Sequence, residues 1–284
     1  MRTVRTLGPL REAVAQSRMA ARPIALVPTM GALHEGHLSL VRLARREAGL
    51  TVVSIFVNPL QFAPGEDFAR YPRREEDDAR LLEKEGVDIL YLPDPAAFYP
   101  ADFSTAIEVG EVSEGGEGAR RPGHFRGVAT VVAKLFLRVL PDVAVFGRKD
   151  LQQVAVIRRM VRDLDLPVRL VIGETVRAAD GLAMSSRNAY LSADERLRAA
   201  DLSRTLFAAR GRAAHGQTDP RQIESDARRQ LEVAGLDVDY VEAVHAETMR
   251  PANRVIPGVA LAAAVRLGKT RLIDNVFLID PAKE

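Results

Sequence analysis

The chain has 284 residues, of which 47% are hydrophobic and 27% charged, close to the composition of an average soluble globular protein. It contains no cysteine, which excludes disulfide frameworks, cysteine-ligated metal sites and thiol catalysis. The 40 Lys and Arg residues are nearly balanced by 38 Asp and Glu residues, so the formal net charge is only +2. Five of these basic residues are lysines, namely Lys84, Lys134, Lys149, Lys269 and Lys283.

Neither the N-terminus nor any internal segment is typical of a targeting signal or a membrane span. Arg11, Glu12 and Arg18 interrupt every apolar run near the N-terminus, so no signal peptide is expected. The longest apolar stretch, residues 128–140, carries Lys134 and Arg138, whereas a spanning helix needs about 20 predominantly apolar residues. We therefore expect a cytoplasmic protein without a membrane partner.

Short apolar runs alternate with amphipathic segments over roughly the first 175 residues. The runs expected to form strands are residues 23–27, 51–57, 87–92, 143–146 and 168–172, with a possible short strand at 105–109. The segments expected to form helices are 36–47, 75–85, 128–140 and 150–163, and residues 113–118 (SEGGEG) are expected to be a mobile loop. This alternation predicts an α/β domain, residues 1–175, with a parallel sheet covered on both faces.

The pattern changes after about residue 176. Helices are expected at residues 193–213 and 220–234, followed by strands at 238–244, 259–265 and 270–278. Helices followed by strands are typical of an α+β unit. We therefore expect a second, smaller domain formed by residues 176–284.

The strongest local signal is the segment PTMGALHEGH, residues 28–37, which follows the first expected strand of the α/β domain. Open α/β sheets bind ligands at the carboxyl ends of their strands, and a helix N-terminus there attracts phosphate. Gly31 and Gly36 allow close approach of the backbone, and His34 and His37 can donate hydrogen bonds to phosphate oxygens. The alternatives are two solvent-exposed or capping histidines, or a metal pair, for which no third ligand is evident nearby.

A second signal is DGLAMSSRN, residues 180–188, near the expected domain boundary. Such a Gly- and Ser-containing segment alone is usually a turn. Together with His34-x-Gly-His37 about 150 residues upstream, it is typical of nucleotidyl-transferring enzymes, as an HIGH-type motif and a KMSKS-type loop. Arg187 takes the place of the last lysine of that loop.

Two further motifs follow strand ends. In FGRKDLQQ, residues 146–153, Lys149 is suited to neutralising phosphate, although a surface lysine followed by Asp150 as a helix cap is an equally ordinary interpretation. In SIFVNPLQF, residues 54–62, Asn58 and Gln61 offer neutral donors and acceptors for a small polar substrate, or are ordinary turn residues.

These motifs, with YPR at residues 71–73 and RPGHFRGV at 121–128, closely resemble in order and spacing those of the pantothenate synthetase (pantoate–β-alanine ligase) family of the HIGH-type nucleotidyltransferase superfamily. The resemblance implies ATP-dependent condensation of (R)-pantoate with β-alanine through a pantoyl-adenylate, releasing AMP and pyrophosphate. It also implies a Rossmann-like domain followed by a smaller C-terminal lid domain, Mg²⁺, and a homodimer.

The resemblance also implies roles for individual residues. The catalytic residues would be His37, His34 and Lys149. The ATP-binding residues would be Met30, Gly31, Ala32, Leu33, His34, Glu35, Gly36, His37, Gly147, Arg148, Lys149, Asp150, Val176, Met184, Ser185, Ser186 and Arg187. The substrate-binding residues would be Gln61, Gln153, Asn58, Tyr71 and Arg121, with Gln61 also lying where β-alanine enters. Asp77 or Asp78 resembles an acidic pair near Mg²⁺.

The sequence departs from the family pattern in two places. Arg148 stands where the family commonly has Glu, and we expect its side chain to point away from the site because Lys149 must face it. The segment before Arg121 is SEGGEGAR instead of a short LEG stretch.

Three alternative functions are open to a chain of this kind. Another nucleotidyltransferase of the same fold would act on a different small acceptor. An arginine-rich nucleic-acid-binding protein would need a clustered basic face, which the mixed-sign segments argue against. A purely structural α/β module would leave five ligand-type motifs unexplained.

Overall fold

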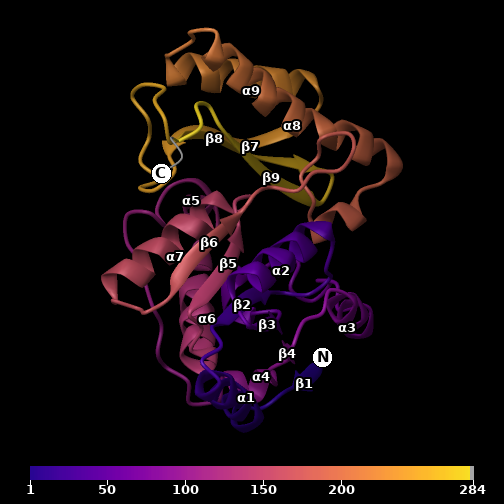
Figure 1. Ribbon diagram of the computed structural model, residues 1–284. Helices are drawn as coiled ribbons and strands as arrows, with labels where there is room; N and C mark the ends of the chain where they lie inside the picture. The colour runs from indigo at the N-terminus through magenta and orange to yellow at the C-terminus, as the bar shows by residue number, and fades with distance from the viewer. Residues whose placement is uncertain (282–284) are drawn as a thin grey trace. The chain divides into compact units, whose positions relative to one another are not determined.

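The computed structural model describes residues 1–281, which form two compact units (Figure 1). Unit 1 comprises Met1–Val109, Arg120–Arg148 and Val156–Glu174. Unit 2 comprises Gly110–Ala119, Lys149–Ala155 and the chain from Thr175 onward. Because a compact unit is not by itself an independently folding domain, the domain boundary expected near residue 176 stays a prediction.

Unit 1 contains a parallel sheet of six strands in the order β1-β4-β3-β2-β5-β6. The strands are β1 (Arg2–Val4), β2 (Ile24–Thr29), β3 (Leu50–Ile55), β4 (Ile89–Tyr91), β5 (Val143–Gly147) and β6 (Arg169–Gly173). The chain leaves β2 for β3 on one side and later returns to β5 on the other. The carboxyl end of β2 is therefore a topological switch point, where ligands bind in open α/β sheets.

Helices cover both faces of this sheet. The helices with residues in unit 1 are α1 (Leu7–Met19), α2 (Glu35–Glu47), α3 (Glu75–Lys84), α4 (Pro95–Phe98), α5 (Gly116–Arg120), α6 (His124–Val139) and α7 (Leu151–Asp163), of which α5 and α7 also have residues in unit 2. Ala25 and Val27 of β2 share a buried cluster with residues of α2 and α3. Ile24 and Leu26 alternate with them and are also fully buried, on the face where α1 and α6 contact β2.

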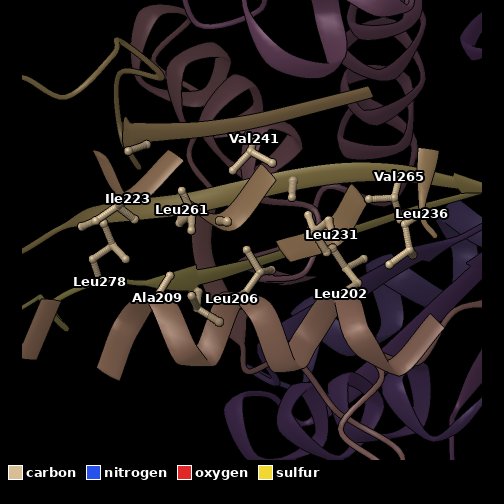
Figure 2. Close-up of a cluster of buried hydrophobic side chains, with 14 of the residues drawn as sticks. Leu202, Leu206, Ala209, Ile223, Leu231, Leu236, Val241, Leu261, Val265 and Leu278 are labelled. Atoms are coloured by element: carbon tan, nitrogen blue, oxygen red, sulfur yellow. The ribbon is translucent and has the colours of Figure 1, made fainter. Parts of the chain in front are cut away.

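Unit 2 contains an antiparallel sheet in the order β7-β8-β9. Its elements are α8 (Ala193–Ala214), α9 (Pro220–Val233), β7 (Asp237–His245), β8 (Val259–Leu267) and β9 (Thr270–Phe277). Leu202 and Leu206 of α8 point toward the sheet in the buried cluster of Figure 2, which also contains Leu261 of β8. The alternate β8 residues Ala260 and Ala262 pack on the other face in a second cluster that includes Leu151. The predicted fold class, a Rossmann-like parallel sheet followed by a smaller α+β part, is confirmed.

The structure differs from the expected elements in several places, including a short helix, α4, at residues 95–98. Strand β1 and helix α1 occupy residues 2–19, where the sequence analysis assigned no element. The strand considered at residues 105–109 does not form. The SEGGEG segment, expected to be mobile, is held by the buried Gln152, whose amide nitrogen donates to the carbonyls of Val112 (3.0 Å) and Gly115 (2.8 Å). Because Gln152 satisfies these backbone groups, the segment has a defined conformation.

Helix α6 approaches the turn η1 (Pro59–Gln61) so closely that it requires a glycine. A Cβ on Gly127 would lie 2.1 Å from the carbonyl oxygen of Leu60, which belongs to the backbone and cannot turn aside. We predict that Gly127→Ala lowers the free energy of unfolding by about 1–3 kcal/mol, the usual cost of overpacking. Gly211→Ala in α8, where a Cβ would meet no atom within 4 Å, should instead raise it by up to about 1 kcal/mol. Urea denaturation measures both; equal stability of the two variants would contradict this packing.

Candidate active site

The loop between β2 and α2 is tightly folded at the switch point of the sheet. Gly31 and Ala32 have φ values of +82° and +50°, in the left-handed region that side chains rarely adopt. A Cβ on Gly31 would lie 2.9 Å from Cγ2 of Ile55, so glycine is required there. This turn directs the backbone N–H groups of the next residues toward α3.

The carboxylate of Asp78 on α3 holds this loop. Its Oδ2 accepts a hydrogen bond from the backbone N–H of Ala32 and its Oδ1 one from that of Leu33, both at 2.8 Å. Burial raises the pKa of the Asp78 carboxyl above its usual value, although the two N–H groups favour the ionised form. Both oxygens are thus used to position the loop.

Asp77, the neighbour of Asp78, is exposed and pairs with Arg80 at 2.5 Å. Across residues 1–281, no group of three or more His, Cys, Asp or Glu side chains could hold a metal ion. The metal-binding role expected for Asp77 or Asp78 therefore has no counterpart in their contacts and stays a prediction.

His34 and His37 form a capping box at the N-terminus of α2. The Nδ1 atom of His34 accepts a hydrogen bond from the backbone N–H of Gly36 (3.1 Å), and that of His37 accepts one from the backbone N–H of His34 (3.3 Å). Because both Nδ1 atoms accept, the proton of each neutral ring is on Nε2. The rings lie 4.1 Å apart between centroids, at a helix N-terminus where the helix dipole favours an anion.

Glu35, between these histidines, is exposed and pairs with Arg42, which also pairs with Glu85 at 2.5 Å. The hydrogen bond from Arg42 lowers the pKa of the Glu35 carboxyl. Glu35, which was expected to bind ATP, thus forms an ion pair on the surface of α2.

The structure brings together two motifs that are distant in the sequence. The Nε2 atom of Gln61, in the turn after β3, donates to Sδ of Met30 in the loop after β2, at 3.0 Å. Asn58 donates from Nδ2 to Oε1 of Gln61 at 3.1 Å, and both carboxamide residues are buried. Neutral hydrogen-bonding groups therefore lie beside residues 30–34 between β2 and α2, the expected nucleotide loop.

Arg121, expected to bind substrate, makes a two-pronged ion pair with Glu66, with both N–O distances 2.7 Å. Burial of Glu66 opposes its ionisation, but the hydrogen bonds from Arg121 lower its pKa below the usual value. The Nη1 atom of Arg121 also lies 3.0 Å from Nε2 of His124. His124 Nδ1 lies 2.8 Å from the carbonyl oxygen of Gln61, which can only accept, so the ring proton is on Nδ1.

Sequence reasoning missed Glu66 and His124 as members of this cluster. The RPGHF motif contains His124, and could have drawn attention to it, whereas nothing in the sequence pairs Glu66 with Arg121. Tyr71, also expected near the substrate, is buried and packs edge-on against Phe62, with ring centroids 5.9 Å apart.

Lys149 and Asp150 belong to unit 2, where they line a pocket with Gln152, Asp274 and Asn275. The Lys149 Nζ lies 3.6 Å from a carboxylate oxygen of Asp150. The Nδ2 atom of Asn275 donates to the Lys149 carbonyl oxygen at 2.8 Å, which fixes the main chain of this lysine on β9.

Three neighbours of Lys149 and Asp150 in the sequence were also expected to bind ATP or substrate, and none of them lines this pocket. Gly147 ends β5 and Arg148 pairs with Glu174 at 2.8 Å, both within unit 1. Gln153 is half-buried on α7, directly after Gln152.

The segment from Val176 to Arg187 folds back on itself within unit 2. The backbone N–H of Met184 donates to the carbonyl of Val176 at 3.0 Å, so these expected nucleotide residues are neighbours. The Ser185 hydroxyl accepts from the backbone N–H of Arg187 (3.3 Å) and caps η2 (Ser186–Tyr190). The buried Asp274 of β9 pairs with Arg177 at 2.6 Å, which anchors the segment beside the strand that holds Lys149.

A six-stranded parallel sheet with paired histidines at a helix N-terminus beside its switch point is the architecture of a Rossmann-like nucleotide-binding enzyme. The family model for pantoate-beta-alanine ligase matches residues 2–277. The chain is 52% identical to the pantothenate synthetase of Rhizorhabdus wittichii, over 99% of this chain and 100% of that protein. It is 54% identical to that of Anaeromyxobacter dehalogenans, over 91% and 92% of the two chains. The chain therefore belongs to the pantoate–β-alanine ligase family.

Solved structures agree with this assignment. A crystal structure of pantothenate synthetase from Thermus thermophilus matches with a TM-score of 0.94 and 48% identity, covering 98% of this chain and 100% of that one. The pantoate-beta-alanine ligase of Francisella tularensis, solved in complex with beta-gamma ATP and beta-alanine, matches with a TM-score of 0.79 and 30% identity over 98% of both chains.

The contacts of Asp78 and Asp77 predict that replacing these adjacent carboxylates changes the free energy of unfolding by very different amounts. Asp78→Ala leaves the N–H groups of Ala32 and Leu33 without their acceptor, at about 1–3 kcal/mol for each buried unsatisfied group. We predict a loss of unfolding free energy in that range or above, with a raised KM for ATP. Asp77→Ala should change stability by less than about 0.5 kcal/mol, as at most surface positions.

The Asp77→Ala variant also tests the expected role of Asp77 in Mg²⁺ binding. If Asp77 is only a surface partner of Arg80, Asp77→Ala reaches half-maximal turnover at the same Mg²⁺ concentration as the unaltered protein. A higher Mg²⁺ requirement in Asp77→Ala would instead support a role in metal binding.

Proposed function

We propose that this pantoate–β-alanine ligase family enzyme condenses (R)-pantoate with β-alanine through a pantoyl-adenylate, with release of AMP and pyrophosphate. The observation that carries the chemistry is the pair of Nε2–H donors of His34 and His37 at the N-terminus of α2. Such a site binds and stabilises phosphate oxygens. Family membership over nearly the whole chain supports pantoate, β-alanine and ATP as substrates.

The reaction needs two displacements because a carboxylate does not condense directly with an amine in water. In the first, a carboxylate oxygen of pantoate attacks the α-phosphorus of ATP and the bond to the β-phosphate oxygen breaks, which releases pyrophosphate. In the second, the amine of β-alanine attacks the carbonyl carbon of the acyl-adenylate, loses a proton and expels AMP. Neither step requires a protein nucleophile, so the protein supplies position and charge neutralisation.

Roles follow from the groups that each residue presents. His34 and His37 donate to phosphate oxygens as their negative charge shifts during the first step. Lys149, a compact cation, and Arg187 neutralise phosphate charge, and Ser186 offers a hydroxyl to the phosphate oxygens. Gln61 binds pantoate beside the nucleotide loop.

A protein-built Mg²⁺ cage does not fit the described residues, since none of their acidic and histidine side chains cluster in threes. No step is therefore assigned to the metal. Mg²⁺ commonly reaches such sites on the phosphates of the nucleotide, retaining several waters, and needs no such cage.

Two finer features complete the proposal. The assembly is a homodimer, as the family resemblance implies, and the protein is cytoplasmic, as expected from a sequence without a recognisable signal peptide. No helix within the part of the chain described by the structure could cross a membrane. Another nucleotidyltransferase activity is not favoured, because the matching relatives are pantothenate synthetases.

The adenylate predicts a partial reaction. Labelled pyrophosphate should exchange into ATP when pantoate is present and β-alanine is absent. Only the first displacement can then take place, and its reversal incorporates labelled pyrophosphate into ATP. His37→Ala should slow this exchange roughly 100-fold, the effect of losing one transition-state donor. His215→Ala, which changes an exposed histidine at the end of α8, serves as the matched control and should exchange normally.

Two results would contradict the proposal at different levels. Exchange that requires β-alanine would exclude a free-standing adenylate step. Normal exchange by His37→Ala would remove the proposed role of that histidine and leave the overall reaction in place.

A further inference from the structure

The side chain of Asn58 has every hydrogen-bonding position filled by the protein itself. Its Nδ2 donates to the carbonyl oxygen of Gly127 and to Oε1 of Gln61, both at 3.1 Å. Its Oδ1 accepts from the hydroxyl of Tyr99 at 3.0 Å and from the backbone N–H of Leu60 at 3.3 Å. A carboxamide offers two donors and two acceptor lone pairs, so Asn58 has no capacity left for a substrate.

These partners also fix which way the carboxamide points. The Gly127 carbonyl can only accept and the Leu60 N–H can only donate. Exchanging the oxygen and nitrogen of Asn58 would set oxygen against oxygen and nitrogen against a donor. Because Asn58 is 1% exposed, water could not compensate for the lost bonds.

The fixed Asn58 in turn decides what Gln61 presents. Its donor occupies Oε1 of Gln61, so that the Gln61 amino group lies on the side of Met30, 3.0 Å from the Met30 sulfur. The backbone carbonyl of the same residue lies 2.8 Å from the protonated Nδ1 of His124, which holds its main chain. Gln61 therefore faces the nucleotide loop as a hydrogen-bond donor.

Tyr99 lies at the end of α4, and its ring is clamped by aromatic and cationic neighbours. The Tyr99 ring packs edge-on against Phe98, and its centroid lies 4.9 Å from that of Phe103. The Lys134 Nζ atom lies 5.0 Å from the centroid of the Tyr99 ring. Burial raises the pKa of the Tyr99 hydroxyl well above its ordinary value, so it stays a proton donor at every working pH. Its hydroxyl makes the shorter of the two bonds to Asn58 Oδ1.

We propose that Tyr99 is a positioning residue for the first half-reaction: through Asn58 it fixes the Gln61 carboxamide as a donor that reads an oxygen of pantoate. This assignment rests on the proposed function. It also fixes the chemistry of that position, since a donor binds a hydroxyl or carboxylate oxygen of pantoate. Asn58 and Tyr99 act through Gln61 and not on the substrate.

The test compares two tyrosine hydroxyls in unit 1. Tyr99→Phe removes the neutral bond to Asn58, and Tyr91→Phe removes a bond that does not involve Asn58, in which the Tyr91 hydroxyl accepts from the Arg138 guanidinium at 2.8 Å. Steady-state KM values for pantoate, ATP and β-alanine are measured in both variants, with thermal unfolding as the stability readout. Loss of one neutral hydrogen bond corresponds to a factor of about two to ten.

We expect Tyr99→Phe to raise the pantoate KM by that factor and to leave the KM values for ATP and β-alanine unchanged. Tyr91→Phe should leave all three KM values unchanged at a comparable loss of stability. An unchanged pantoate KM in Tyr99→Phe, or an equal rise in all three KM values, would overturn the assignment. Absence of pantoate-dependent turnover in the unaltered protein would overturn the proposed function and this assignment with it.

Discussion

The carboxamide of Asn58 is the contact on which the architecture of the site in unit 1 depends. It joins the turn after β3, the first turns of α6 and the residue that ends α4. The contact needs α6 close to the turn, which is possible because Gly127 has no side chain to meet the Leu60 carbonyl. The hydrogen bonds of Asn58 therefore depend both on the close approach that Gly127 allows and on the position of Tyr99.

The same principle recurs around the loop between β2 and α2, where protein groups occupy acceptor atoms of the side chains. Backbone N–H groups occupy Nδ1 of His34 and His37 and both oxygens of Asp78, and Asn58 occupies the Gln61 oxygen. Phosphates and carboxylates are acceptors, so a site whose acceptors are satisfied internally attracts such anions without a large net charge. The overall charge of +2 therefore says little about the local chemistry.

The sequence predicted most strands and helices, because apolar runs and amphipathic periods are local signals. It also located the ligand-bearing segments, since these follow strand ends. It did not predict that Arg121 pairs with Glu66, that Asp78 caps a loop more than forty residues away, or that Asn58 is saturated. These contacts join segments that only the folded chain brings together. The SEGGEG segment was expected to be mobile for the same reason, because the sequence does not show that Gln152 would donate hydrogen bonds to its backbone.

A double-mutant cycle tests whether Tyr99 and Asn58 act on catalysis only through Gln61. The quantity measured is kcat/KM for pantoate in the unaltered enzyme, Tyr99→Phe, Gln61→Ala and the double variant. We expect Tyr99→Phe to have no further effect once Gln61 is alanine, which is strong non-additivity between linked groups. The same fold-loss from Tyr99→Phe in both backgrounds would contradict it.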